Sequence, residues 1–190
     1  MRSVKTALML FISLWITTGV VYPVAVTVIG RLAFPDQSGG SLIRKNDGTV
    51  VGSRLIGQSF NDPKYFWSRP SATGDFPYNS MASGGSNLGP TNPELLKQVA
   101  ERVDSLQKSG LPGPIPADLA LASGSGLDPH ISLEAALGQV PRVAQARQME
   151  EGKLRRLVQD RLEDRQLGFL GMPRVNVVLL NLALDDTGGR

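Results

Sequence analysis

The N-terminal segment constrains this chain most, because it contains a long run without a charged side chain. Thr6 to Gly30 are 25 such residues, bounded by Lys5 and Arg31. As an α-helix, this run would be about 37 Å long, which is enough to cross a hydrocarbon core of about 30 Å with some tilt. Pro23 lacks a backbone N–H and is expected to kink the helix. We interpret residues 6–30 as one retained transmembrane helix.

Two other interpretations of this segment were weighed against the membrane span. A cleaved signal peptide has a shorter apolar core, usually about 7–15 residues, that ends in a small-x-small site. The best such site here, Val28-Ile29-Gly30, is a weak match. A buried helix of a soluble protein would rarely be apolar on all sides over this length. The length therefore favours a membrane span over both alternatives.

The charges beside this segment predict its orientation. Arg2 and Lys5 lie in a five-residue N-terminal tail, which the positive-inside tendency keeps in the cytoplasm. We therefore expect a cytoplasmic tail at residues 1–5, the span at residues 6–30 and one extracytoplasmic domain at residues 31–190. This external domain of about 160 residues has room for a single core.

Composition excludes several classes of function for the external domain. Without Arg2 and Lys5, 18 basic residues face 17 acidic ones, so the domain carries a net charge of +1. No basic stripe indicates nucleic-acid binding. The absence of cysteine excludes disulfides, thiolate metal sites and a cysteine nucleophile. With His130 as the single histidine, no transition-metal site is predicted.

Short β-prone and helical segments together predict an α+β fold for this domain. Ser41–Arg44 and Thr49–Gly52 flank Asn46-Asp47-Gly48, a strong hairpin signal, and residues 55–58 are expected to end that sheet. Asn92 and Ser132 are expected to cap helices. The other expected elements are an apolar helix stripe of Leu96, Val99, Val103 and Leu106, a helix end or start at Pro141, helices at residues 143–148 and 150–165, a strand at 174–178 with a buried continuation at 179–184, and a frayed tail at 185–190.

Two segments are predicted to be long, unusual loops. Residues 60–92 are rich in proline, glycine and serine but also contain aromatic residues, which ordinary linkers and disordered segments lack. We expect an ordered loop pinned by its aromatic side chains, which are Phe60, Tyr65, Phe66, Trp67, Phe76 and Tyr78. Residues 122–132 form the second loop. Ordered loops of such length are usually functional.

Chemistry at these loops would depend on His130. Ser123, Ser125, Asp128 and His130 lie within eight residues, but the Gly-x-Ser-x-Gly elbow is absent and Pro129 argues against presuming an Asp–His bond. A tethered serine hydrolase is kept as the least favoured hypothesis. The glycines of residues 84–87 and 124–126 could form anion nests, but no Lys-Ser/Thr pair follows, so simple glycine turns are favoured.

A set of short segments spread over nearly the whole chain forms a highly specific pattern when taken in order. These segments are residues 18–23, 52–58, 65–72, 78–79, 83–88, 92–93, 122–132, 142–144, 175–177 and 180–185. In sequence and order they closely resemble the C subunit of the bacterial Kdp potassium-transporting ATPase. The glycine-proline connector at residues 111–116 and the tail at Thr187 depart from the family pattern.

This resemblance implies an accessory subunit without chemistry of its own, in the bacterial plasma membrane. In the family, a channel-like subunit conducts potassium and a P-type ATPase subunit hydrolyses ATP with Mg, while the C subunit assembles with them and stabilises them. It is also described as a catalytic chaperone that raises the ATP affinity of the ATPase subunit. No cofactor is expected on this chain itself.

The resemblance also implies functional residues. The glutamine of Leu55-Ile56-Gly57-Gln58 is described in the family as a nucleotide contact, which conflicts with an external Gln58. The small residues of the helix suit packing against neighbouring membrane helices, and the loops offer an interface that would cap the potassium-conducting subunit. The expected interface residues are Thr18, Gly19, Tyr65, Trp67, Arg69, Asn87, Asp128 and His130. The alternative is a membrane-anchored external binding module unrelated to a pump.

Overall fold

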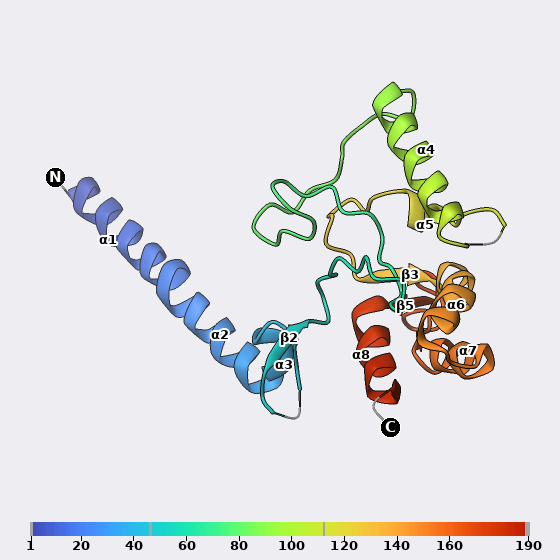
Figure 1. Ribbon diagram of the computed structural model, residues 1–190. Helices are drawn as coiled ribbons and strands as arrows, with labels where there is room; N and C mark the ends of the chain where they lie inside the picture. The colour runs from blue at the N-terminus through green and yellow to red at the C-terminus, as the bar shows by residue number, and fades with distance from the viewer. Residues whose placement is uncertain (1, 46, 112, 189–190) are drawn as a thin grey trace. The chain divides into compact units, whose positions relative to one another are not determined.

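The computed structural model describes residues 2–45, 47–111 and 113–188, and it divides into two compact units. The first unit extends to Val51 and the second begins at Gly52. The first contains the N-terminal helix, a short helix and most of a two-stranded sheet. The second contains a three-stranded sheet, five helices and the two long loops (Figure 1).

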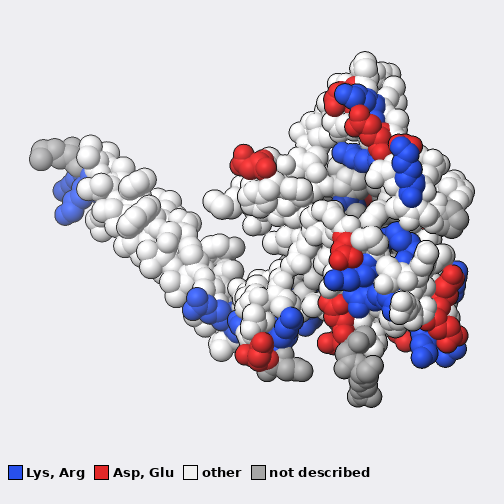
Figure 2. All heavy atoms as spheres, viewed as in Figure 1, with Lys and Arg blue, Asp and Glu red and all other residues white. Residues whose placement is uncertain are grey.

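The N-terminal helix is continuous over 32 residues, from Arg2 to Ala33, and none of its residues is buried. It consists of α1 (Arg2–Ile16), the π-helical turn η1 (Thr17–Val21) and α2 (Tyr22–Ala33). In the described residues it is the one helix long and apolar enough to cross a membrane. Figure 2 shows its surface free of charge between basic side chains near its two ends.

Pro23 affects this helix through the preceding turn. The N–H of Tyr22 donates to the carbonyl of Thr17, five residues back, which defines the π-helical turn. The wider turn adjusts the backbone just before a residue that cannot donate to Gly19. The backbone irregularity expected at Pro23 is therefore present as a π-helical turn within an unbroken helix. The first unit then continues through α3 (Pro35–Ser38).

The predicted β-hairpin is present. Strands β1 (Leu42–Arg44) and β2 (Val50–Ser53) pair in a two-stranded sheet, with Gly48 at a φ of +83° in the turn. Asn46 of the predicted turn lies outside the described residues. The expectation that residues 55–58 end this sheet is wrong. The chain turns back at Arg54, Ile56 forms an isolated bridge with Ser53, and the N–H of Gly57 donates to the carbonyl of Leu127.

The second unit is built around a small antiparallel sheet with the strand order β3-β5-β4. Its strands are β3 (His130–Ser132), β4 (Leu162–Glu163) and β5 (Arg174–Asn176). Ile131 and Leu162 both lie opposite Val175, which is fully buried. The helices α6 (Leu133–Arg147), α7 (Glu151–Asp160) and α8 (Val177–Gly188) pack around the sheet (Figure 1). The fully buried core residues include Phe66, Ala135, Val140, Val143, Leu154, Val158, Val177, Leu180 and Leu184.

Three expectations in this region are wrong. Residues 177–184 form a helix and not the continuation of a strand, because the side chain of Asn176 accepts from the N–H of Leu179 and caps it. The helix predicted for residues 150–165 ends at Asp160, and Leu162 belongs to β4. Pro141 lies inside α6, which continues to Arg147. Pro141 lacks the N–H that would have donated to Leu137, so α6 has one backbone hydrogen bond fewer at this point.

The predicted tail is also more ordered than expected. The helix α8 continues through Asp185 to Gly188, and Asp185 is bound by two side chains of the second unit. Residues 189–190 lie outside the described residues. At the other expected helix, α4 (Pro93–Lys108), Asn92 accepts from the N–H of Glu94 as predicted. Its apolar stripe is not a core face, because only Leu106 is buried and Leu96 is 59% exposed.

The first long loop is present as predicted, and the second is shorter than predicted, because residues 130–132 form β3. Among the described residues, no helix or regular strand lies between β2 and α4, and Phe66 in this loop is fully buried. Phe76, however, is 58% exposed, so the aromatic residues do not all serve as anchors. The connector after α4, in which Pro112 lies outside the described residues, leads to α5 (Ala117–Ala120) and then to the second loop.

Candidate functional site

The loop at residues 60–92, which we call the aromatic loop, is fixed to the helices α6 and α8 by side-chain amides. These amides take the place of a neighbouring strand. The backbone N–H of Phe66 donates to Oδ1 of Asn181 at 2.9 Å, and Nδ2 of Asn181 donates to the carbonyl of Phe66 at 2.9 Å. Gln139 does the same for Trp67, with distances of 2.7 and 3.2 Å. Both amides are buried, so α6 and α8 satisfy the backbone of a buried loop.

Arg142 of α6 binds the same loop through its guanidinium group. It donates to the carbonyls of Pro63 at 2.7 Å and Tyr65 at 3.1 Å, and its Cζ lies 3.8 Å from the ring centroid of Trp67. The guanidinium group thus stacks on the indole of Trp67 and at the same time donates hydrogen bonds to two backbone carbonyls of the loop. Burial lowers the pKa of Arg142 to about 10.

Tyr65 links the loop to the end of α8. Its hydroxyl donates to Oδ2 of Asp185 at 3.0 Å, and the same carboxylate pairs with Arg147 at 2.6 Å. The guanidinium of Arg147 lies 4.9 Å from the Tyr65 ring centroid. Burial and the acceptor Asp185 raise the pKa of the Tyr65 hydroxyl. Tyr65, Trp67 and the intervening Phe66 are therefore anchored to two helices.

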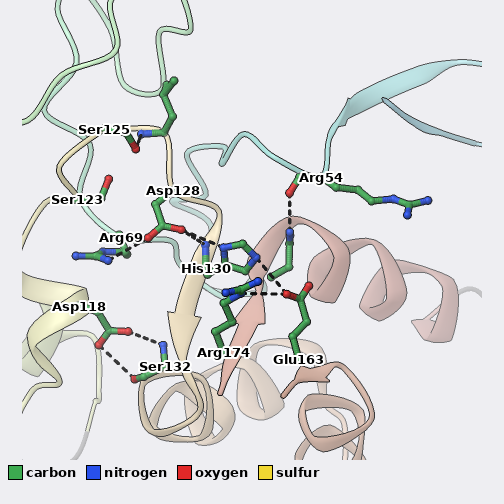
Figure 3. Close-up of polar contacts among 12 residues, drawn as sticks. Arg54, Arg69, Asp118, Ser123, Ser125, Asp128, His130, Ser132, Glu163 and Arg174 are labelled. Carbon is green, nitrogen blue, oxygen red and sulfur yellow. Dashed lines mark hydrogen bonds and ion pairs between the residues drawn. The ribbon is translucent and has the colours of Figure 1, made fainter. Parts of the chain in front are cut away.

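A second group of contacts connects the two loops to the sheet through two arginines, two carboxylates and one imidazole. Arg69 pairs with Asp128 at 3.1 Å, and Asp128 contacts Nδ1 of His130 at 3.1 Å. Nε2 of His130 lies 3.5 Å from Glu163, which pairs with Arg174 at 3.1 Å. Figure 3 shows these side chains in sequence, with the imidazole between two carboxylates. We call these five residues the ion chain.

The Asp128–His130 contact, which the sequence alone gave no ground to presume, is present. Oδ1 of Asp128 accepts from the backbone N–H of His130 at 3.0 Å, which folds the side chain across Pro129 and toward the ring. Burial raises the pKa of Asp128, but the hydrogen bonds from His130 and the charge of Arg69 outweigh it, so the net pKa is lowered below 3.8.

The hydroxyls near His130 are engaged in the turns of their own loop. Oγ of Ser123 accepts from the N–H of Gly126 at 2.9 Å, and Oγ of Ser125 accepts from the N–H of Leu127 at 3.2 Å. Figure 3 shows both serines away from the imidazole, whose nitrogens face Asp128 and Glu163. This arrangement is not that of a serine nucleophile paired with its base.

The glycine segments of the two loops pack against each other. The N–H of Gly84 donates to the carbonyl of Ser125 at 2.9 Å, and the hydroxyl of Ser83 donates to the same carbonyl at 3.1 Å. Gly126 has a φ of +67°, and a Cβ built on it would lie 2.7 Å from the carbonyl oxygen of Gly84. These glycines allow a close approach of two backbones, so the two predicted loops form one structure.

Gln58 lies beside this structure. The hydroxyl of Ser68 donates to its backbone carbonyl at 2.9 Å, and its side chain lies close against Gly52. A cavity of about 370 Å³ adjoins it, lined by Gly52, Ser53, Ile56, Gly57, Gln58, Ser59, Pro77 and Tyr78. Among the described residues that line this cavity there is no Lys or Arg to neutralise a phosphate.

A larger hollow of about 620 Å³ lies between the aromatic loop and α4. Trp67, Arg69 and Tyr78 line it from the loop, and Gln98 and Arg102 line it from the helix. The hydroxyl of Tyr78 donates to the carbonyl of Arg69 at 2.6 Å, which holds this wall in place. Among the described residues, no group of three or more His, Asp or Glu side chains could hold a metal ion.

The structure brings together most of the interface residues expected from the sequence. Tyr65, Trp67, Arg69, Asp128 and His130 all belong to the second unit, in the two anchored loops or where they meet the sheet. Asn87 is exposed with a φ of +52°. Thr18 and Gly19 lie in the π-helical turn of the first unit, where the Thr18 hydroxyl donates to the carbonyl of Leu14.

Sequence reasoning missed the partners of these residues. Gln139, Arg142 and Asn181 are polar positions within otherwise apolar helical segments, and this was the signal that could have marked them. Glu163 and Arg174 join the ion chain only through the pairing of β4 with β5. Two large apolar side chains of the loop at residues 60–92 are exposed and do not anchor it. Phe76 is 58% exposed and Met81 is 96% exposed.

The comparisons with known proteins agree over nearly the full length. Residues 4–186 match the family described as K+-transporting ATPase, c chain. The potassium-transporting ATPase KdpC subunit of Geotalea uraniireducens is 58% identical over 97% of this chain and 98% of its own. The KdpC subunit of Geobacter sulfurreducens is 57% identical with the same coverage, and that of Citrifermentans bemidjiense is 57% identical over the whole of both chains.

The chain belongs to the KdpC family. The match includes both loops, the ion chain and all but the first residues of the N-terminal helix. The resemblance inferred from the sequence is thus confirmed, as is an α+β fold with one N-terminal apolar helix.

Proposed function

We propose that this chain is a non-catalytic accessory subunit of an ATP-driven potassium uptake complex in the bacterial plasma membrane. Its family and the name of its relatives, potassium-transporting ATPase KdpC subunit, support membership of such a complex. The apolar N-terminal helix supports a single membrane span. Arg2 and Lys5 before that helix support a cytoplasmic N-terminus and an external second unit.

The observation that carries a role in assembly is the anchoring of the aromatic loop. A segment without regular secondary structure is held by buried amides and a guanidinium from α6 and α8. A loop already fixed in one conformation loses less entropy on binding a partner. We propose that this surface binds and stabilises the potassium-conducting subunit, and that α1–α2 packs in the membrane against it and the P-type ATPase subunit.

ATP hydrolysis and its Mg belong to the ATPase subunit in this proposal, and this chain binds no cofactor. With the second unit outside, Gln58 cannot reach cytoplasmic ATP. An effect on the ATP affinity of the ATPase subunit then has to pass through α1–α2 or through the partner subunits. Replacing Gln58 with Ala should therefore leave the KM of the purified complex for ATP unchanged. A raised KM in a complex of normal yield would contradict this topology.

Four experiments test membership and orientation, two for each. A tag on the ATPase subunit should recover this chain from solubilised membranes, and deletion should abolish growth at micromolar potassium. An unrelated membrane-anchored module would do neither. A reporter fused after Arg190 should be active outside the cytoplasm, and protease added to intact spheroplasts should digest the second unit. Protection in intact spheroplasts and digestion only after lysis would place the unit inside.

A surface variant tests the proposed interface without disturbing the anchors. Phe76 and Met81 are 58% and 96% exposed on the aromatic loop, so replacing both with Ser should leave the fold intact. We expect the yield of purified complex to fall, and to fall further when Trp67 and Arg69 are replaced. Gln145→Ser on the exposed side of α6 is the control. An intact, active complex from the Phe76 and Met81 variant would exclude this surface.

A further inference from the structure

The chain between β4 and β5 forms a short hairpin whose apolar end the proposed function does not use. Leu167, Phe169, Leu170 and Met172 are 82%, 67%, 48% and 75% exposed. We call these four side chains the apolar tip. Four large apolar residues within six positions are far more than isolated surface residues would explain, and such patches mark interaction sites.

The hairpin that carries the tip is an ordered turn. Gln166 and Leu170 exchange two backbone hydrogen bonds, at 3.0 and 2.9 Å. Leu167 and Gly168 have φ values of +54° and +81°, as at the two central positions of a type I′ turn. Asn, Asp or Gly is the usual residue at the first of these positions. The turn instead carries a leucine there, so turn geometry does not explain why this exposed position is apolar.

The charges around the tip indicate which surface it fits. Arg161 and Arg165 are exposed on either side of Asp164, just before the hairpin. Glu163 and Arg174 neutralise each other at its base. Apolar side chains beside exposed arginines are typical of segments that lie in a membrane interface, where the guanidinium groups meet lipid phosphates and the apolar groups lie below them.

The length of the tether keeps a bilayer within reach of the tip. The second unit begins at Gly52, and 18 residues separate it from Ala33 at the end of α2. Fully extended, they would span at most about 65 Å, and α3 and the β1–β2 hairpin shorten this. A weak interfacial contact is then strengthened by the high effective concentration of a tethered group.

We propose that the apolar tip inserts into the headgroup region of the bilayer that α1–α2 crosses. The tip gives the second unit a second attachment to the membrane and limits its rotation about the tether. This inference rests on the membrane span of the proposed function, but it does not require the partner subunits. It assigns the hairpin a lipid surface and not a protein as its partner.

The absence of native cysteine allows a direct test in the full chain. Phe169→Cys, labelled with the environment-sensitive fluorophore NBD, is reconstituted in vesicles of phosphatidylethanolamine and phosphatidylglycerol. We expect blue-shifted emission and at least about twofold stronger quenching by shallow doxyl-labelled lipid than at the control position. The matched control is Met81→Cys, an exposed apolar residue of the other loop. Equal emission and quenching at both positions would overturn the proposal.

Two further arms separate the alternatives. The fluorescence is measured first on this chain alone and then with the potassium-conducting and ATPase subunits added. A blue shift at position 169 that arises only after their addition would mean that a protein covers the tip. That outcome would also overturn the proposal. Carbonate extraction of the same vesicles reports on the membrane span independently. A chain that resists extraction but shows no lipid quenching at position 169 refutes the tip alone, whereas an extracted chain refutes the span.

Discussion

The side-chain amide of Asn181 pairs with both backbone groups of Phe66, as a neighbouring β-strand would. The two hydrogen bonds are each 2.9 Å long, and both residues are buried. Gln139 repeats the arrangement at Trp67. The loop thus crosses the core with its backbone satisfied by two helices, which lets an irregular segment lie where a regular strand would otherwise be required.

Replacing Asn181 with Leu keeps the size of the side chain but leaves the N–H and C=O of Phe66 buried without partners. Since each such group costs about 1–3 kcal/mol, we expect the free energy of unfolding to fall by about 2–5 kcal/mol. The measurement is urea unfolding of the purified chain in detergent, followed by the fluorescence of Trp67 and Trp15. Gln145→Leu, an exposed change on α6, should alter stability by less than about 0.5 kcal/mol.

Arg142 holds the loop by its charge and its shape together. In Arg142→Leu, the carbonyls of Pro63 and Tyr65 lose their donor and the Trp67 ring loses its stacked cation. Relief of the buried charge offsets part of this loss, so we expect the free energy of unfolding to fall by about 1–3 kcal/mol. The control is Arg155→Leu, which breaks an exposed pair with Glu151 and should cost less than about 0.5 kcal/mol. Equal losses for the two variants would exclude an anchoring role for Arg142.

The lowered pKa of Asp128 predicts an acid sensitivity. In the folded chain the pKa of Asp128 lies below its unfolded value of 3.8, so folding favours the charged carboxylate. Its contribution to stability is therefore fully present above that pH and is lost as the pH falls through the lower folded pKa. We expect Asp128→Asn to be less stable than the wild type at pH 6, with the difference shrinking below pH 4.

This difference is measured as the urea midpoint of both proteins between pH 6 and pH 2. Asp62 also has a lowered pKa, because the N–H of Lys64 donates to it. The pH dependence of each protein's stability therefore includes contributions from other carboxylates. The difference between the two proteins isolates Asp128. Asp104→Asn removes an exposed pair with Lys108 and should give a curve parallel to the wild type. A difference between Asp128→Asn and wild type that stays constant with pH would mean that the ion chain does not lower this pKa.

Local signals in the sequence predicted the elements that depend on local chemistry. The charge-free run predicted the N-terminal helix, and Asn92 and Ser132 cap helices as expected. The helix α8 was missed because residues 177–184 are apolar at every position except Asn181, which leaves no period to separate a buried helix from a buried strand. The amide of Asn176 just before them was the available helix-start signal.

The candidate site was predicted only in part, because its contacts join residues far apart in the chain. The loops, with Trp67, Arg69 and Asp128, were marked by their composition. Glu163 was interpreted as part of a helix, since Leu162 continues the apolar spacing of α7, and its place beside His130 follows from strand pairing. The contact of Asp128 with His130 could not be presumed from two residues so close in sequence with Pro129 between them, yet the carboxylate turns back to accept the N–H of His130.

Gly126 provides the clearest test that the two loops form one structure. Its φ of +67° disfavours any side chain, and an added Cβ would lie 2.6 Å from Cγ2 of Thr73 and 2.7 Å from the carbonyl oxygen of Gly84. The backbone of Gly84 is held by its bond to Ser125 and cannot move aside without breaking it. We expect Gly126→Ala to lower the free energy of unfolding by about 2–4 kcal/mol and to separate the loops.

Gly124, two residues earlier in the same loop, is the matched control for this change. It has no positive φ, and nothing lies within 4 Å of an added Cβ. Gly124→Ala should therefore change stability by less than about 0.5 kcal/mol. Hydrogen exchange at the N–H of Gly84, which donates to Ser125, reports on the contact directly and should accelerate only in Gly126→Ala. Unchanged protection of that N–H in Gly126→Ala would show that the loops do not depend on this close approach.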